Sequence, residues 1–310
     1  MELKARIEKK SNTARDLLPS FENCRMSIEI TNICNHKCIF CPCGRGLSTR
    51  KKSYINDELC LRIIKEGYEL GVREITFQIY GEPFINKNLN KYVQFAKQLG
   101  YSYVYLTTNG SLASPKKIDA ILAAGLDSIK FSVNGTTKEK YLKIHGCDDF
   151  ETVKRNIKYC NSARKNYNRK INLFISCVVT DKSMSEVQMF KDEFIEFVDD
   201  VVFYRADIRG GLVPENLKLA VSLPPLKQGR KCVQPFNGIC ISCEGMLSPC
   251  CLDYDLNLVI GNLCDSNLKD LYYSDKFIQF RESHINNDLK NMQCEKCLNS
   301  DSAWLTVLDL

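Results

Sequence analysis

Short β-rich runs alternate with longer helical segments from residue 27 to about residue 206, and this alternation restricts the fold more than any other feature. The segments between the runs repeat apolar residues at three- and four-residue steps, as helices with one buried face do. Strands separated by such helices pair in parallel through right-handed crossovers. The predicted strands cover residues 27–31, 74–80, 103–109, 128–133, 171–179 and 201–206.

Six strand–helix units are fewer than the eight that close a TIM barrel. We therefore expect an α/β fold: an open, partial (β/α)6 TIM-like barrel, followed by a small C-terminal domain made of a hairpin and a helix. Ligands of such barrels bind at the carboxyl ends of the strands. The predicted crossover helices cover residues 57–70, 90–100, 115–125, 152–160 and 185–198.

The alternation stops after about residue 206, where glycines and prolines become frequent. Beyond this stretch the sequence predicts a hairpin over 237–250 and one helix over 267–282. The predicted domains are an N-terminal extension (1–26), the partial barrel (27–206), a linker (207–231) and the small C-terminal domain (232–310).

Charge and hydropathy argue against two classes of partner. The chain has 43 basic and 37 acidic side chains, and its excess of +6 is spread out, with only short clusters such as Arg50, Lys51 and Lys52. No run approaches the roughly 18 apolar residues of a membrane span, and the first 20 residues have no apolar signal region. We expect a soluble, cytoplasmic protein that binds neither nucleic acid nor membranes.

Seventeen cysteines are the most unusual part of the composition. The number is odd and no export signal precedes them, so a disulfide scaffold is not expected. Several cysteines lie in closely spaced groups, which favours metal or iron–sulfur ligation. None of the three histidines has a metal-ligand or catalytic partner at a usable spacing in the sequence.

The first group, Cys34, Cys38 and Cys41, forms a CxxxCxxC triplet directly after the first predicted strand. Three thiolates at this spacing can hold three corners of a cubane iron–sulfur cluster and leave one iron without a protein ligand. A zinc loop is the alternative, with His36 or Cys43 as the fourth ligand.

Phe40 precedes the third cysteine, and the resulting CxxxCx-aromatic-C pattern resembles the signature of the radical S-adenosylmethionine (radical SAM) superfamily, which shares the partial barrel. The resemblance implies a 4Fe-4S cluster on the three cysteines, with S-adenosylmethionine on its open iron and Phe40 against the adenine. It implies reductive cleavage to methionine and a 5′-deoxyadenosyl radical, which abstracts a substrate hydrogen. The electron would come from a donor such as flavodoxin or ferredoxin.

The ends of the next strands add to this resemblance. Tyr80, Gly81, Glu82 and Pro83 resemble the GGEP motif of the family, with tyrosine in place of the first glycine. In relatives the backbone carbonyls and the glutamate of this motif hold the amino group of S-adenosylmethionine. Asn109 and Ser132 end the third and fourth strands, where relatives hold the ribose and the carboxylate. Polar residues that cap strands for structural reasons are the alternative.

The C-terminal domain resembles the SPASM and shorter twitch extensions of radical enzymes over residues 232–298. The shared features are a first cysteine, a hairpin that ends in Pro-Cys, a Gly-Asn pair and a closing CxxC. The resemblance implies a second 4Fe-4S cluster held by Cys232, Cys250, Cys294 and Cys297. Cys251 is the rival of Cys250, and adjacent residues on a strand point to opposite faces, so only one of the two is expected to ligate.

A non-enzymatic scaffold is the alternative from a different class. Cys240 and Cys243 form a further CxxC pair, which together with Cys294 and Cys297 would suit a zinc ribbon. Neither a zinc scaffold nor an iron–sulfur electron carrier needs a Gly-Glu-Pro motif and polar residues at successive strand ends.

The domain plan is similar to that of the aminocyclitol dehydrogenases. This similarity implies an oxidoreductase that abstracts a carbinol hydrogen from a sugar, polyol or aminocyclitol and passes an electron to the auxiliary cluster, giving a ketone. Arg205 or Tyr204, at the end of the sixth strand, would hydrogen-bond the substrate hydroxyl. An ion pair between Arg205 and Asp207 is the structural alternative. Hydrogen return from Cys251 would give epimerisation instead.

Modification of a ribosomal precursor peptide or of a protein is the remaining alternative, because SPASM enzymes also crosslink peptides. Such maturases often carry an N-terminal peptide-recognition domain of about 80 residues, whereas 26 residues precede the first predicted strand. The small-molecule substrate is therefore the favoured expectation.

Overall fold

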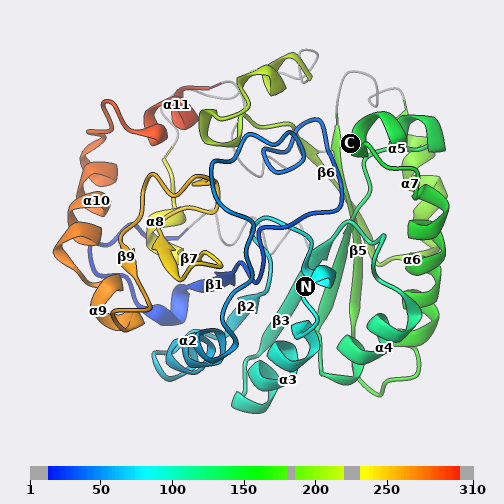
Figure 1. The fold of residues 1–310 in the computed structure, drawn as a ribbon, viewed down its shortest axis with the longest axis horizontal. Helices are drawn as coiled ribbons and strands as arrows, with labels where there is room; N and C mark the ends of the chain where they lie inside the picture. The colour runs from blue at the N-terminus through cyan, green and yellow to red at the C-terminus, as the bar shows by residue number, and fades with distance from the viewer. Residues whose placement is uncertain (1–12, 180–185, 220–230, 301–310) are drawn as a thin grey trace.

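A computed structural model describes residues 13–179, 186–219 and 231–300. Its barrel part consists of six strands that pair in parallel and in sequence order, which confirms the predicted α/β partial barrel (Figure 1). The strands are β1 (Arg25–Ile28), β2 (Glu74–Thr76), β3 (Tyr103–Thr108), β4 (Ser128–Ser132), β5 (Asn172–Val179) and β6 (Asp200–Arg205).

Crossover helices cover one face of this sheet. They are α2 (Asp57–Glu69), α3 (Leu89–Leu99), α4 (Pro115–Ala123), α5 (Lys138–His145), α6 (Phe150–Arg164) and α7 (Val187–Phe194). The sequence analysis missed α5, although Thr137 caps its first turn and Gly146 ends it in the left-handed conformation. The helix is short and buries only three of its residues, so its apolar repeat is weak.

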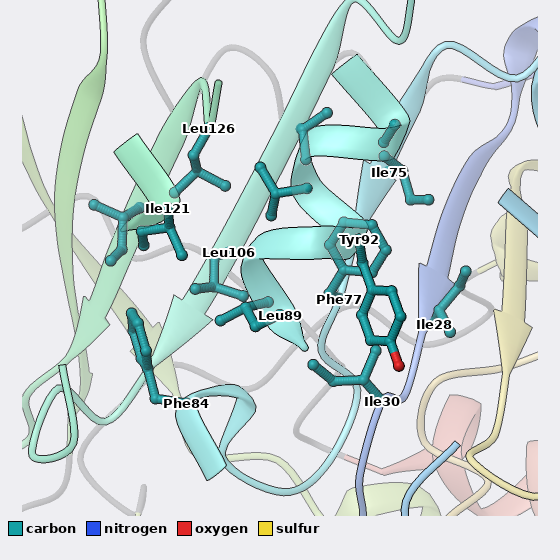
Figure 2. Close-up of a cluster of buried hydrophobic side chains, with 14 of the residues drawn as sticks. Ile28, Ile30, Ile75, Phe77, Phe84, Leu89, Tyr92, Leu106, Ile121 and Leu126 are labelled. Carbon is teal, nitrogen blue, oxygen red and sulfur yellow. The ribbon is translucent and has the colours of Figure 1, made fainter. Parts of the chain in front are cut away.

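The core lies between the sheet and the helices. The even-numbered residues of β1, Met26 and Ile28, are fully buried in it. Figure 2 shows Ile28 in this core together with Ile75, Leu106 and the helical Tyr92. Full burial of one such side chain stabilises the fold by about 1.5–3 kcal/mol. Since side chains alternate along a strand, the odd-numbered residues of β1 face the interior of the barrel.

The C-terminal hairpin continues the barrel sheet instead of forming a separate layer. β7 (Gly238–Ile241) pairs in parallel with β1, so the sheet has nine strands. The other strands are β8 (Met246–Ser248) and β9 (Gly261–Asn262), and the helices of this region are α8 (Gln234–Asn237), α9 (Leu268–Tyr272), α10 (Asp275–Asn286) and α11 (Gln293–Asn299).

Three local expectations differ from the structure. The strand predicted over 74–80 ends at Thr76, and the chain turns toward Gly81. The single helix predicted over 267–282 is two helices, because Ser274 breaks the run and caps α10. The described part of the predicted linker contains short 3-10 turns, and Asn216 donates from its side chain to the carbonyls of Phe40 (3.1 Å) and Asp207 (2.7 Å).

In the described ranges, 13–179, 186–219 and 231–300, no helix combines the length and the apolar character that crossing a bilayer requires.

Candidate active site

The cysteines of the triplet gather at the carboxyl ends of the barrel strands. Cys34, Cys38 and Cys41 line a cavity of about 360 Å³ that extends into the barrel interior. Phe40 also lines it and is buried against Ile144, Val178 and Ala206. Three thiols that face one cavity are the donor set of a site-differentiated 4Fe-4S cluster, so these residues fit the implied group.

Gly81 holds the cluster loop against the end of β2. Its φ is +71°, and a Cβ atom at this position would lie 2.3 Å from the carbonyl oxygen of Thr31. The next residue, Glu82, donates its backbone N–H to the carbonyl of Ile33 at 2.8 Å. The Gly-Glu pair therefore fixes the backbone that leads into Cys34, and only glycine fits the close approach.

Glu82 joins the ends of β2 and β3. Its carboxylate is 1% exposed and accepts hydrogen bonds from the Thr108 hydroxyl (2.7 Å) and from the backbone N–H groups of Phe84 (3.0 Å) and Asn109 (2.8 Å). Burial raises the pKa of Glu82 to about 7. A carboxylate offers about four lone-pair positions, so one remains for a ligand ammonium group in the cavity that Glu82 lines.

Asn109 and Ser132 also line the cavity. The Asn109 side-chain amide donates to the side-chain oxygen of Asn35 at 3.0 Å and lies 3.9 Å from the sulfur of Cys34. The Ser132 hydroxyl accepts a hydrogen bond from the Asn134 amide at 3.4 Å. The structure thus brings all five predicted cofactor-binding residues to the cavity that holds the three cysteines.

A buried pair of histidines supports Cys38, which the sequence analysis did not foresee. The backbone N–H of Asn134 donates to His145 Nε2 (3.2 Å), so the His145 proton is on Nδ1. Nδ1 lies 3.1 Å from His36 Nδ1 and 3.5 Å from Cys38 Sγ, and His36 Nε2 lies 2.9 Å from the Asp149 carboxylate. Burial lowers the pKa of His145 to about 3, which keeps the ring neutral.

The barrel interior is polar. Lys130 reaches across it and donates to the Tyr204 hydroxyl at 3.4 Å, with its ammonium group 5.0 Å from the Tyr204 ring centre. The sequence analysis missed Lys130, although Ser128, Lys130 and Ser132 alternate with buried apolar residues. Other interior residues that it missed are Arg25, Ser27, Thr76, Gln78, Tyr105, Ser176 and Gln234.

The predicted catalytic residues of β6 reach the same cavity. Tyr204 and Arg205 both line it, and both are buried. Asp207 forms its ion pair with Arg209, whose backbone N–H also donates to the Asp207 carboxylate at 2.7 Å. Asp207, the alternative partner considered for Arg205, thus has Arg209 as one ionic partner.

Six of the eight C-terminal cysteines line one of two cavities. Cys232, Cys250, Cys294 and Cys297 line a second pocket, which we call the auxiliary pocket. Four thiols from distant positions in one pocket fit a fully protein-ligated iron–sulfur cluster. Cys251 instead lines the large cavity, within hydrogen-bond reach of Cys240. The structure therefore places Cys250 with the predicted ligands and Cys251 with the predicted catalytic residues.

Arg50 ties the segment after the cluster loop to the C-terminal hairpin. Its guanidinium forms ion pairs with Glu29, next to β1, and with Glu244 (2.6 Å), in the turn between β7 and β8. The Arg50 and Glu29 side chains are 8% and 1% exposed, so this pairing is buried. Arg50 also donates to the carbonyl of Tyr254 at 3.1 Å and contacts the Cys243 sulfur.

Two family models match the chain. Residues 28–190 match the radical SAM superfamily, and residues 232–298 match SPASM, an iron–sulfur cluster-binding domain. These matches favour iron–sulfur clusters and S-adenosylmethionine as the cofactors over the zinc loop and the zinc ribbon considered above.

Similar proteins include the S-adenosyl-L-methionine-dependent 2-deoxy-scyllo-inosamine dehydrogenase of Niallia circulans, 22% identical over 88% of this chain and 92% of that protein. A probable GTP 3′,8-cyclase of Saccharolobus islandicus is 34% identical, over 43% of this chain and 42% of that protein.

Solved structures with a similar fold include BtrN in complex with AdoMet and 2-DOIA, with a TM-score of 0.61 and 17% identity over 92% of this chain and 98% of BtrN. Streptococcus suis SuiB bound to S-adenosylmethionine has a TM-score of 0.68 and 17% identity over 96% of this chain and 73% of SuiB. From its barrel, its cysteine sites and the two matching family models, the chain belongs to the radical SAM superfamily and is a radical SAM enzyme with a SPASM domain.

Proposed function

We propose that this enzyme oxidises a carbinol of a small hydroxylated substrate, such as a sugar, a polyol or an aminocyclitol, to a ketone. The observation that carries the proposal is the cavity of about 360 Å³, which joins the three cluster-loop cysteines to a barrel interior lined by hydroxyl, amide and cationic side chains. Hydroxyl-rich substrates need many hydrogen-bond partners when they leave water.

The bound cofactors would supply a 5′-deoxyadenosyl radical that takes a hydrogen atom, and an auxiliary cluster that takes one electron. The chain itself must hold the carbinol and remove the hydroxyl proton. Lys130 and Tyr204 form a hydrogen-bonded pair in the cavity, and Arg205 follows Tyr204 on β6. We assign them to hydrogen bonds with the substrate hydroxyl, where a neighbouring cation favours loss of its proton; the proton would pass to the carboxylate of Asp207, which lines the same cavity.

The similarity to the dehydrogenase of Niallia circulans, which extends over 92% of that protein, supports the proposed oxidation of a carbinol. Two alternatives remain as outcomes of the test. Cys251 lines the same cavity, and hydrogen return from its thiol would give epimerisation. SuiB has been solved bound to its precursor peptide SuiA, so peptide modification is the other alternative.

The test is a product analysis with candidate polyols, sugars and aminocyclitols that carry deuterium at the carbinol carbon. Dehydrogenation predicts one 5′-deoxyadenosine per ketone, with the substrate deuterium recovered in the 5′-deoxyadenosine. Solvent hydrogen at that carbon without a redox change would replace the proposal by epimerisation. A modified peptide as the product would overturn the small-molecule substrate.

Replacing Lys130 by methionine and Tyr204 by phenylalanine should lower ketone formation by about 10²–10⁴-fold, the usual range for acid–base groups. Hydrogen abstraction, measured as deuterium transfer, should fall less. Equal losses of both would show that these residues position the substrate rather than remove its proton.

A further inference from the structure

His284 is a buried histidine whose ring has no hydrogen-bond partner in the described part of the chain. It lies on α10 and is 3% exposed. Neither Nδ1 nor Nε2 is bonded to another described group. The same side chain lines the auxiliary pocket together with the four cysteines.

A neutral imidazole has one N–H donor and one lone pair, and buried polar groups are nearly always paired. The remaining wall of the auxiliary pocket does not supply a partner: it consists of Pro235, Leu252, Leu258, Phe280, Leu298 and Gln293. Gln293 donates its amide to the carbonyl of Leu252 at 3.1 Å. The partner of His284 is therefore expected in the group that fills the pocket.

The other two histidines make the contrast clear. His36 and His145 are also buried, yet each of them has protein partners on both ring nitrogens. An imidazole ring carries at least one N–H donor whether it is neutral or protonated. A neutral ring beside four thiolates can donate one hydrogen bond to sulfur.

We propose that His284 donates a hydrogen bond from its ring to a sulfur of the auxiliary cluster and thereby raises the reduction potential of that cluster. The four cysteines complete the iron ligands, so the histidine acts as a tuning residue and not as a ligand. A hydrogen bond to sulfur stabilises the more negative, reduced cluster. A higher reduction potential would make the cluster a better electron acceptor, and this role rests on the proposed function, in which the cluster accepts an electron from the substrate.

The experiment isolates the auxiliary cluster in the Cys34→Ala/Cys38→Ala/Cys41→Ala protein and measures its potential by a redox titration followed by electron paramagnetic resonance. In that background His284→Phe should keep about four irons and shift the reduction equilibrium at least tenfold toward the oxidised cluster, which is 59 mV for one electron. His284→Gln, which keeps a donor, should shift it less. Leu258→Val, which removes one methylene from the same pocket wall, is the matched packing control and should leave the potential unchanged.

An unchanged potential in His284→Phe would overturn the proposal, and so would a Leu258→Val shift of equal size. A second measurement leaves His284 unchanged and uses the same triple-alanine protein, which lacks the cluster beside His36 and His145: labelled with ¹⁵N-histidine, it should show a weak nitrogen coupling in the reduced auxiliary cluster. A strong coupling would make His284 an iron ligand, and no coupling would remove it from the site; either result overturns the proposal. Because no step uses substrate, failure of the dehydrogenase test leaves these outcomes unaffected.

Discussion

The two cysteine sites of this molecule are built in opposite ways. The cluster loop brings its three cysteines from eight consecutive residues, and a polar network surrounds them: Asn109 lies beside Cys34 and His145 lies beside Cys38. The auxiliary pocket draws its cysteines from positions as far apart as Cys232 and Cys297, and its wall is mainly apolar. The first site is set by a local turn fixed to strand ends, and the second by the tertiary fold.

This contrast can be tested most strongly by removing one ligand from each site. Cys38→Ala should abolish 5′-deoxyadenosine formation, because the cofactor would lose the cluster that binds it. Cys294→Ala should keep 5′-deoxyadenosine formation but lose ketone formation. Iron and product analysis of anaerobically reconstituted protein provides the measurement, with about eight irons in the unmodified protein.

Cys264→Ser is the matched control, because this exposed thiol lies in neither site and should have no effect. If Cys294→Ala stops 5′-deoxyadenosine formation as completely as Cys38→Ala does, the two sites are not separate in function. In that case the different construction of the two cysteine sites would not correspond to different functions.

The second test concerns the connection between the two regions. Arg50→Ala should lower the free energy of unfolding by about 3–5 kcal/mol, because it leaves the buried Glu29 carboxylate without its partner. Arg45→Ala is the control: its pair with Glu215 is exposed, and its loss should cost about 0–1 kcal/mol. Denaturant unfolding of both variants measures the difference. Similar values would mean that the Arg50 pairing does not hold the regions together.

The third and smallest effect concerns Glu82, at the polar site. Its pKa is raised to about 7, so the carboxyl group is neutral at lower pH and becomes a carboxylate as the pH rises. If Glu82 holds the amino group of S-adenosylmethionine, affinity should rise by up to about tenfold per pH unit below that pKa and then level off. Equilibrium binding of S-adenosylmethionine across this range measures the effect.

Glu82→Gln should bind more weakly and flatten the pH profile, whereas Glu215→Gln, an exposed control, should keep it. If the pH dependence of binding is unchanged in Glu82→Gln, Glu82 does not bind the amino group. Its role would then be the structural one, which is to join the ends of β2 and β3.

Much of the fold could be predicted because its signals are local. Apolar periodicity identified the six strands and most helices, and the hairpin over 237–250 was marked by β-rich runs around a turn. The pairing of β7 with β1 was out of reach, since it joins residues more than 200 positions apart and no local pattern encodes the neighbour of a strand. The close approach of Gly81 to Thr31 was out of reach for the same reason, because it joins residues 50 positions apart.

In the active site, too, the local features could be predicted and the long-range contacts could not. The cluster-loop cysteines were visible as a spacing, whereas the His36–His145 pair was not, because these residues are over 100 positions apart. Lys130 had a visible signal, since it is a polar residue at an inward position between Ile129 and Phe131. It was missed because a single charged residue in a strand does not by itself indicate whether it faces solvent or a cavity.

β7 is synthesised long after β1, the strand with which it pairs, and this order has a consequence for folding during translation. β1 leaves the ribosome with one edge that only residues 238–241 can cover. At about 5–20 residues per second, that edge waits roughly 10–40 s for its partner. An uncovered strand edge of this kind invites pairing with other chains. We therefore expect the β1 edge to be the part of the nascent barrel most open to pairing with other chains until the hairpin has been made.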